Sequence, residues 1–145
     1  MTSIRYREML EKEFIPIAQG TNCVADWWFM QDGARPHRTT EVFDLLDEHF
    51  PRRVLGLDYN AKYGGGMDWP PYSPDLNPCD FFLWGYLKDR AYREEPATIE
   101  DLKQKILEES RSIPTETLAR VTEGFQCRLA AVIDQDGMHV EKFHL

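Results

Sequence analysis

Two aspartates stand where a rigid element is expected to begin or end, which is where carboxylates can hold a divalent cation. Asp32 follows an apolar run, residues 25–30, that predicts a buried strand. Asp80 lies just inside a helix that Asn77 and Pro78 are expected to open. Hard cations such as Mg2+ prefer oxygen ligands, and two carboxylates on rigid elements can share such an ion. We therefore expect Asp32 and Asp80 to converge as metal ligands.

The segments around these aspartates resemble the catalytic core of mariner-like DNA transposases of the DDE/D superfamily. The first segment is MQDGARPH, residues 30–37, and the second is WPPYSPDLNPCDFFLWGYL, residues 69–87. The order of the two segments and their approximate distance make the resemblance specific, and it extends from about Tyr6 to the GMHVEKFHL ending. It implies an α/β chain with a partial RNase H-like fold, in which a few-stranded sheet with flanking helices is followed by a C-terminal αα hairpin.

The resemblance also implies a function and partners. Residues 1–145 would form a single truncated catalytic domain, with residues 93–145 as its C-terminal helical part. Proteins of this family cut DNA and transfer its strands in the nucleus, with two Mg2+ or Mn2+ ions held by three acidic residues. Asp32 and Asp80 match the second and third of these. The expected partners are DNA, which in the family means transposon ends, and a second copy of the chain or an intact transposase.

The first acidic residue of the family has no counterpart in this chain. The family carries it on the first strand of the fold, in a block of strands that is missing here. Asp26 points to the same face as Asp32 but lies about 20 Å away at ~3.3 Å per residue, too far for ions about 4 Å apart. Other nearby acids are expected on the outer face of a helix, namely Glu8, Glu11 and Glu13. We therefore expect the chain alone to bind metal poorly and to be inactive.

Each of these residues also has a simpler interpretation. Without the surrounding motifs, Asp32 would be a turn residue before Gly33, and Asp80 an acid that favours a helix start. Asp75 is expected to form a turn rather than to act as a third ligand. The aspartates are separated by 47 residues, longer than typical mariner spacing by about one loop, which leaves the subfamily open.

The charge of the chain limits how it can meet DNA. Its 17 basic and 25 acidic residues give a net charge of −8, so general attraction to phosphate is unfavourable and any contact must be local. Arg52 and Arg53 form a second basic grouping near the proposed site. The predicted nucleic-acid-binding residues, beside the first aspartate, are Arg35, His37 and Arg38. His37 has the equally good alternative role of ordering the turn.

The aromatic and proline residues before Asp80 allow two further interpretations. The segment 69–72 could stack on unpaired bases, although packing is the preferred interpretation. Pro71 and Pro74 also fit a short PxxP ligand pattern, which is common and therefore weak.

Hydrophobic spacing predicts the elements that carry these residues. Helices are expected over residues 3–18, 40–50, 80–92, 98–113 and 114–137, and strands over 27–31 and 53–57. Tyr6 belongs to the apolar stripe of the first helix, and Thr98 with Asp101 is expected to cap the fourth. Four side chains of the second helix are expected to face inward, namely Val42, Leu45, Leu46 and Phe50. Strand, helix and strand in this order predict a parallel crossover with an exposed sheet edge where further strands belong. The glycine-rich segment 58–68 predicts a flexible surface loop, and the last two helices predict the αα hairpin.

Other features restrict the class of protein. Three cysteines without a CxxC pair favour neither a disulfide framework nor a zinc site. No apolar segment approaches the roughly 18 residues of a membrane span, so we expect an intracellular protein without a membrane partner. The alternative to a transposase fragment is a non-enzymatic interaction module that pairs with another protein through the exposed sheet edge.

Overall fold

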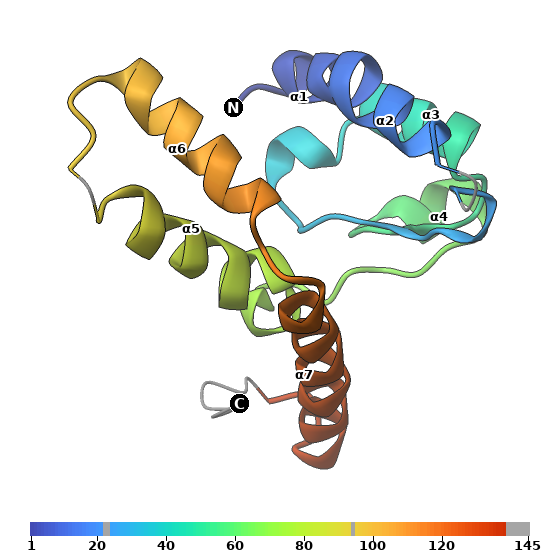
Figure 1. The fold of residues 1–145 in the computed structure, drawn as a ribbon. Helices are drawn as coiled ribbons and strands as arrows, with labels where there is room; N and C mark the ends of the chain where they lie inside the picture. Colours follow the sequence, from blue (N-terminus) through green and yellow to red (C-terminus); the bar gives the residue numbers. More distant parts are fainter. Residues whose placement is uncertain (22–23, 94, 139–145) are drawn as a thin grey trace. The chain divides into compact units, whose positions relative to one another are not determined.

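The computed structural model describes residues 1–21, 24–93 and 95–138. The chain forms two compact units that meet in sequence between Tyr72 and Ser73 (Figure 1). This boundary comes earlier than the start at residue 93 that we predict for the C-terminal helical part. No helix within the described ranges is long and apolar enough to cross a membrane.

A helix opens the first unit, as its hydrophobic spacing predicts. It is built from α1 (Ser3–Met9), the π-helical turn η1 (Leu10–Phe14) and α2 (Ile15–Gln19). Thr2 caps its start by accepting a hydrogen bond from the Arg5 N–H. Pro16 has no N–H to donate, and the wider π-helical turn leads the chain into it.

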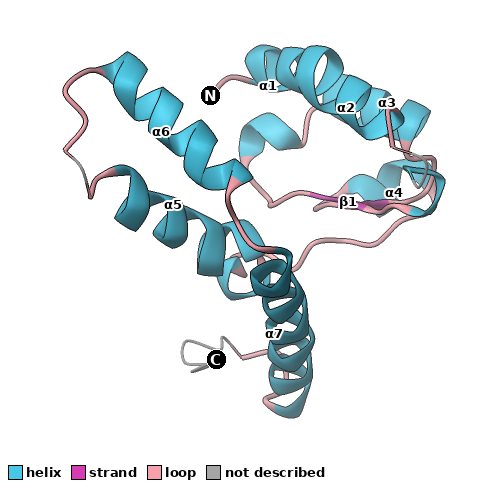
Figure 2. Cartoon of the chain, in the orientation of Figure 1, coloured by secondary structure: helices cyan, strands magenta, loops and turns pink. Residues whose placement is uncertain are grey.

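The sheet of the first unit has two parallel strands, β1 (Phe29–Met30) and β2 (Val54–Leu55). The helix α3 (Thr40–His49) connects them, which confirms the predicted crossover (Figure 2). β1 is shorter than the strand predicted over residues 27–31, and it is only partly buried. Residues 24–26 form the 3-10 turn η2 (Val24–Asp26), so the apolar run 25–30 is not one continuous buried strand. Two strands neither confirm nor exclude a partial RNase H-like fold, which stays a prediction.

The core of the first unit lies between the N-terminal helix, α3 and the sheet. All four side chains predicted to face inward from the α3 segment are buried, and Phe43 joins them. The rings of Phe14, Phe29 and Phe50 contact one another beside this cluster. The buried cluster consists of Tyr6, Leu10, Ile15, Ala18, Val42, Phe43, Leu45, Leu46, Phe50, Val54 and Tyr59.

Residues 58–68 are not the flexible loop that their glycines predict. They begin with the short helix α4 (Tyr59–Tyr63), and Tyr59 is fully buried, with its ring stacked on Tyr63. The Tyr59 hydroxyl donates a hydrogen bond to Asp47 of α3. After the glycines, Met67 forms a parallel bridge with Leu55. Aromatic packing therefore fixes a segment whose composition alone suggests mobility.

The second unit is helical. It contains the 3-10 turn η4 (Pro74–Leu76), the π-helical turn η5 (Cys79–Leu83), α5 (Trp84–Ala91), α6 (Ile99–Arg111) and α7 (Thr115–Asp134). Thr98 accepts a hydrogen bond from the Asp101 N–H, as expected for the predicted cap of α6. α6 packs against α5, whereas α7 contacts η4 (Figure 1). The helical hairpin is thus formed by α5 and α6, not by the last two helices.

Candidate functional site

Asp32 lies immediately beyond the carboxyl end of β1. The Gln31 N–H donates the last hydrogen bond of the ladder, to the Leu55 carbonyl at 3.0 Å. The chain then turns, because Asp32 Oδ1 accepts a hydrogen bond from the Ala34 N–H at 3.1 Å. The Asp32 side chain is 42% exposed, so its carboxylate reaches solvent. The structure thus places Asp32 two residues after Met30, the last residue of β1, and its role as a ligand stays a prediction.

His37 lies against this carboxylate. It ends the 3-10 turn η3 (Arg35–His37), which returns the chain toward Asp32. Its Nδ1 is 2.6 Å from Asp32 Oδ1, although the approach is oblique to the ring N–H direction. The Tyr6 ring stacks on the His37 imidazole, with the two ring centroids 4.0 Å apart.

Buried hydrogen bonds connect Tyr6 and His37 through Gln31. The Tyr6 hydroxyl donates to Gln31 Oε1 at 3.0 Å, and Gln31 Nε2 donates to the His37 carbonyl at 2.9 Å. Tyr6 and Gln31 are both nearly inaccessible to solvent. Burial, and secondarily the negative charge of Asp32, raise the pKa of the Tyr6 hydroxyl above its ordinary value. The spacing of apolar residues predicts only that Tyr6 lies on a helix face and does not indicate this polar role.

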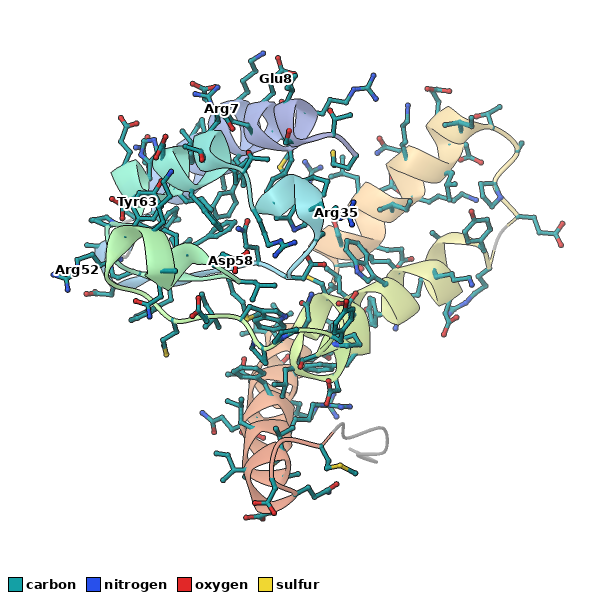
Figure 3. All side chains as sticks on the ribbon, turned by 180° about the vertical axis from the view of Figure 1, so that it is seen from behind. Arg7, Glu8, Arg35, Arg52, Asp58 and Tyr63 are labelled. Atoms are coloured by element: carbon teal, nitrogen blue, oxygen red, sulfur yellow. The ribbon has the colours of Figure 1, made fainter. Side chains whose placement is uncertain are left out.

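Of the two arginines beside Asp32 that are predicted to contact DNA, one is free of ion pairs with described residues and the other is not. Arg35 is exposed, and no described residue forms an ion pair with it (Figure 3). Arg38 is engaged, since its Nη1 lies 2.7 Å from Asp58 Oδ2. Arg35 is therefore the better candidate for an approaching phosphate.

Arg52 and Arg53 do not form a basic patch beside Asp32. Arg53 Nη1 donates to the carbonyls of Val24 and Trp27, which holds the turn before β1. Arg52 Nη2 donates to the Gly64 carbonyl, and Arg52 lies at the opposite end of the first unit from Arg35 (Figure 3). Both arginines have structural roles that charge clustering in the sequence does not reveal.

Asp80 lies in the first turn of η5 in the second unit and is exposed. Asn77 opens this turn, because its Oδ1 accepts a hydrogen bond from the Cys79 N–H at 3.0 Å. The Asn77 amide also donates to Asp80 Oδ2 at 2.8 Å. Asn77 thus opens the turn, and Asp80 lies in its first turn, as the simpler interpretation of Asp80 expects, with its carboxylate bonded to the Asn77 side chain.

Asp75 lies within η4, as expected for a turn former, and is buried together with Arg128 of α7. Arg128 Nη1 donates to the Asp75 carbonyl at 3.4 Å, and its guanidinium lies 4.4 Å from the centroid of the Phe81 ring. These contacts fix the turn that precedes Asp80. Arg128 was not recognised from the sequence, because nothing in its local spacing indicates a partner 53 residues away.

The aromatic segment before η4 contains residues in opposite environments. Trp69 is buried with 3% exposure, as the packing interpretation predicts, whereas Tyr72 is 97% exposed. Tyr72 also has a positive φ of 58°. Only Tyr72 of these two presents its ring to solvent.

The donor chemistry at both aspartates suits a hard cation, although each supplies only one ligand. Each carboxylate has one oxygen in hydrogen bonds, Oδ1 of Asp32 and Oδ2 of Asp80, and no described residue bonds to the other oxygen. In the described ranges, no three His, Cys, Asp or Glu side chains gather as a metal site. Asp32 and Asp80 belong to different units, and their convergence stays a prediction.

Comparisons with known proteins confirm the similarity to transposases. No protein-family model matches the chain. Over 94% of its length it is 31% identical to the Transposable element Tc3 transposase of Caenorhabditis elegans, of which it covers 38%. Over 91% of its length it is 26% identical to the Transposable element Tcb2 transposase of Caenorhabditis briggsae, of which it covers 43%. The chain is therefore similar to transposases of the Tc1/mariner type and spans less than half the length of these relatives.

Proposed function

We propose that the chain is the later part of a DDE/D catalytic domain with an RNase H-like fold, derived from a Tc1/mariner-type transposase. The observation that carries this proposal is the solvent-accessible Asp32 carboxylate at the end of a parallel strand. Similarity to two transposases over nearly the whole chain supports it. The nucleus is the expected place of action, since the substrate would be DNA.

Asp32 and Asp80 would supply ligands to Mg2+ or Mn2+ in this function. When bound, two such ions activate a water or a DNA 3′-hydroxyl and stabilise the leaving oxygen. The chain itself would hold one carboxylate at a strand end and one in the first turn of a helix. Each keeps one oxygen without a hydrogen-bond partner among the described residues, as ligation requires.

Arg35 would contact a DNA phosphate close to Asp32. It is exposed and unpaired within the described residues, whereas Arg38 is held by Asp58. The exposed Tyr72 ring offers a surface on which an unpaired base can stack. These contacts are few, so DNA affinity of the chain alone should be low and sensitive to salt.

Catalysis by the chain alone should be absent, because its two candidate carboxylates leave the family's first ligand position unfilled. The test is nicking of supercoiled plasmid by the purified chain with Mn2+, compared with Asp32→Ala. We expect no metal-dependent cleavage by either protein. Robust cleavage that Asp32→Ala abolishes would refute the inactive-fragment proposal.

The ligand assignment can be tested without turnover. Mn2+ should broaden the NMR signals of residues near Asp32 and Asp80, and Asp32→Asn should remove the broadening around Asp32. Asp68→Asn is the matched control, because Asp68 is also an exposed aspartate of the first unit. Equal broadening in all three proteins would contradict the assignment.

The alternative function is a protein-interaction module that pairs through its sheet edge. In the described residues β1 has β2 as its only strand neighbour, so its outer edge is open to another strand. Trp27 and Trp28, which precede β1, are 40% and 49% exposed. Sedimentation of the chain with a longer transposase of the same type distinguishes the two functions, since a stable complex formed without DNA supports pairing.

A further inference from the structure

One oxygen of the Asp32 carboxylate carries both polar contacts that described residues make with the group. Ala34 donates its N–H to Oδ1 at 3.1 Å, and His37 Nδ1 lies 2.6 Å from the same oxygen. No described residue donates to Oδ2. The carboxylate is therefore asymmetric, with one oxygen inside the protein network and the other facing outward.

We propose that His37 is a positioning residue, which holds Asp32 by an Nδ1–H contact to Oδ1 and thereby leaves Oδ2 as the single oxygen for a divalent cation. This inference rests on the proposed function of Asp32 as a metal ligand. It assigns to His37 a role through the carboxylate in place of a direct contact to DNA.

The surroundings of Nδ1 require a proton on that atom. Nδ1 is shielded from solvent, and Asp32 Oδ1 is its close polar neighbour among the described residues. An unprotonated Nδ1 beside a carboxylate oxygen at 2.6 Å would be repulsive, whereas an N–H on Nδ1 makes the contact favourable even though it points obliquely to the oxygen. A proton on Nδ1 is thus the arrangement that explains the short distance.

Three further contacts keep the His37 ring in place. The Tyr6 ring stacks on the imidazole at an interplanar angle of 29°. Gln31 ties the two residues together by accepting from the Tyr6 hydroxyl and donating to the His37 carbonyl. Outer hydrogen bonds of this kind orient metal ligands, and their loss typically lowers metal affinity or activity about 10- to 100-fold.

The protonation of Nδ1 can be measured directly. Nitrogen-15 NMR of the neutral His37 ring, which distinguishes its two tautomers, should show the proton on Nδ1. In Asp32→Ala the ring should lose this preference. An unprotonated Nδ1 in the wild-type chain would overturn the proposal, and this readout needs neither metal nor DNA.

Two substitutions of His37 separate the effect of its N–H donor from the effect of its stacked ring. His37→Phe keeps a ring that can stack on Tyr6 but removes the donor, whereas His37→Asn removes the ring and keeps an N–H donor. With Mn2+ alone as the probe, broadening of the Gly33 and Ala34 amide signals should show affinity about 10- to 100-fold weaker for His37→Phe. His37→Asn should retain most of the affinity, and thermal unfolding of each variant establishes that it is folded.

The outcomes distinguish this proposal from the proposed function. Wild-type affinity in His37→Phe would overturn the positioning role and leave Asp32 as a ligand. Equal weakening in both variants would also overturn it, because the loss would then follow the Tyr6 stack and not the donor. If Mn2+ has no effect near Asp32 in the wild-type chain, the ligand role of Asp32 fails, and the positioning role fails with it.

Discussion

At the scale of single residues, Tyr6 lies in an apolar and a polar environment at once. Its ring packs in the core while its hydroxyl meets Gln31 Oε1, so one side chain serves both the hydrophobic cluster and the polar network at Asp32. Gln31 is only 6% exposed, so solvent can hardly replace a lost donor. A buried acceptor left without a partner costs about 1–3 kcal/mol.

Tyr6→Phe should therefore lower the free energy of unfolding by about 1–3 kcal/mol. The ring is retained, so the loss isolates the hydroxyl. Urea unfolding followed by circular dichroism measures the change. Tyr72→Phe is the matched control, because Tyr72 is 97% exposed and should unfold like the wild type. Equal stability of Tyr6→Phe and wild type would contradict the hydrogen bond.

Alkaline pH should destabilise the fold through the same residue. Burial raises the pKa of Tyr6 above the ordinary value of 10.0, so the folded chain holds this proton more tightly than the unfolded chain. The raised pKa of Tyr6 therefore contributes to the free energy of unfolding. This contribution is fully present below about pH 10 and is lost as the pH rises through the pKa of Tyr6 in the folded chain. Burial raises the pKa of Tyr59 in the same direction, with a further contribution from its hydrogen bond to Asp47.

The measurement is urea unfolding at about pH 8 and about pH 11, on either side of the ordinary tyrosine pKa of about 10. Wild-type stability should fall between the two, and Tyr6→Phe should show a smaller fall because it has no hydroxyl to ionise. An identical fall in both proteins would assign the alkaline loss to other groups.

At the scale of elements, two glycines after α4 both have a positive φ but differ in the space available for a side chain. Gly64 has φ +62° and open space where a Cβ would stand, whereas Gly66 has φ +74° and a Cβ there would overlap the Val54 carbonyl and the Tyr59 ring. Gly66 precedes Met67, which bridges to Leu55 of β2. Its lack of a side chain lets this strand extension approach the sheet.

Gly66→Ala should therefore destabilise the first unit more than Gly64→Ala. Both variants incur the cost of a left-handed conformation, about 1–2 kcal/mol. Only Gly66→Ala must also displace the backbone beside β2, so the difference between the variants measures the steric overlap. Thermal unfolding gives both values, and equal melting temperatures would contradict the close approach at Met67.

The cap of α6 offers a second test at this scale. Thr98→Ala removes the acceptor for the Asp101 N–H and should cost about 1 kcal/mol. Thr122→Ala is the control, since Thr122 lies inside α7 and its hydroxyl donates to the Leu118 carbonyl of the preceding turn. Urea unfolding monitored by helical circular dichroism should show a loss for Thr98→Ala alone.

Structural features that depend on interactions between nearby residues can be predicted from the sequence, whereas those that depend on distant residues cannot. Local signals predicted the cap at Thr98, the buried face of α3 and the parallel order of β1 and β2, because spacing and capping act over one or two turns. The same signals failed for residues 58–68, where Tyr59 packs against residues from a distant helix. Composition alone cannot reveal such packing.

For the candidate site, too, local features could be predicted from the sequence and distant contacts could not. Asp32 at a strand end and Asp80 in a first turn were recognised from short motifs. The roles of Gln31 and Tyr6 were missed because they depend on contacts across 25 residues of sequence. Arg53 was grouped with Arg52 as a basic pair near the site, since its charge is visible in the sequence but its carbonyl partners are not.

At the scale of the whole molecule, charge decides where DNA can approach. The net charge of −8 opposes binding in general. A groove of about 720 Å3 between α1 and α3 is lined by more acidic than basic side chains. Arg7 lies in this groove beside Glu8 and forms an ion pair with Glu11 (Figure 3). Phosphate should avoid this surface and approach Arg35 instead.

Arg35→Ala should accordingly weaken binding of single-stranded DNA and reduce the slope of log affinity against log salt by about 1, which is one phosphate contact. Arg7→Ala removes the same charge from the acidic groove and should leave the slope unchanged, so the pair separates a local contact from net charge. Fluorescence anisotropy across a series of salt concentrations measures both slopes. If the two variants lose affinity equally, DNA responds only to total charge, and Arg35 is not a specific contact.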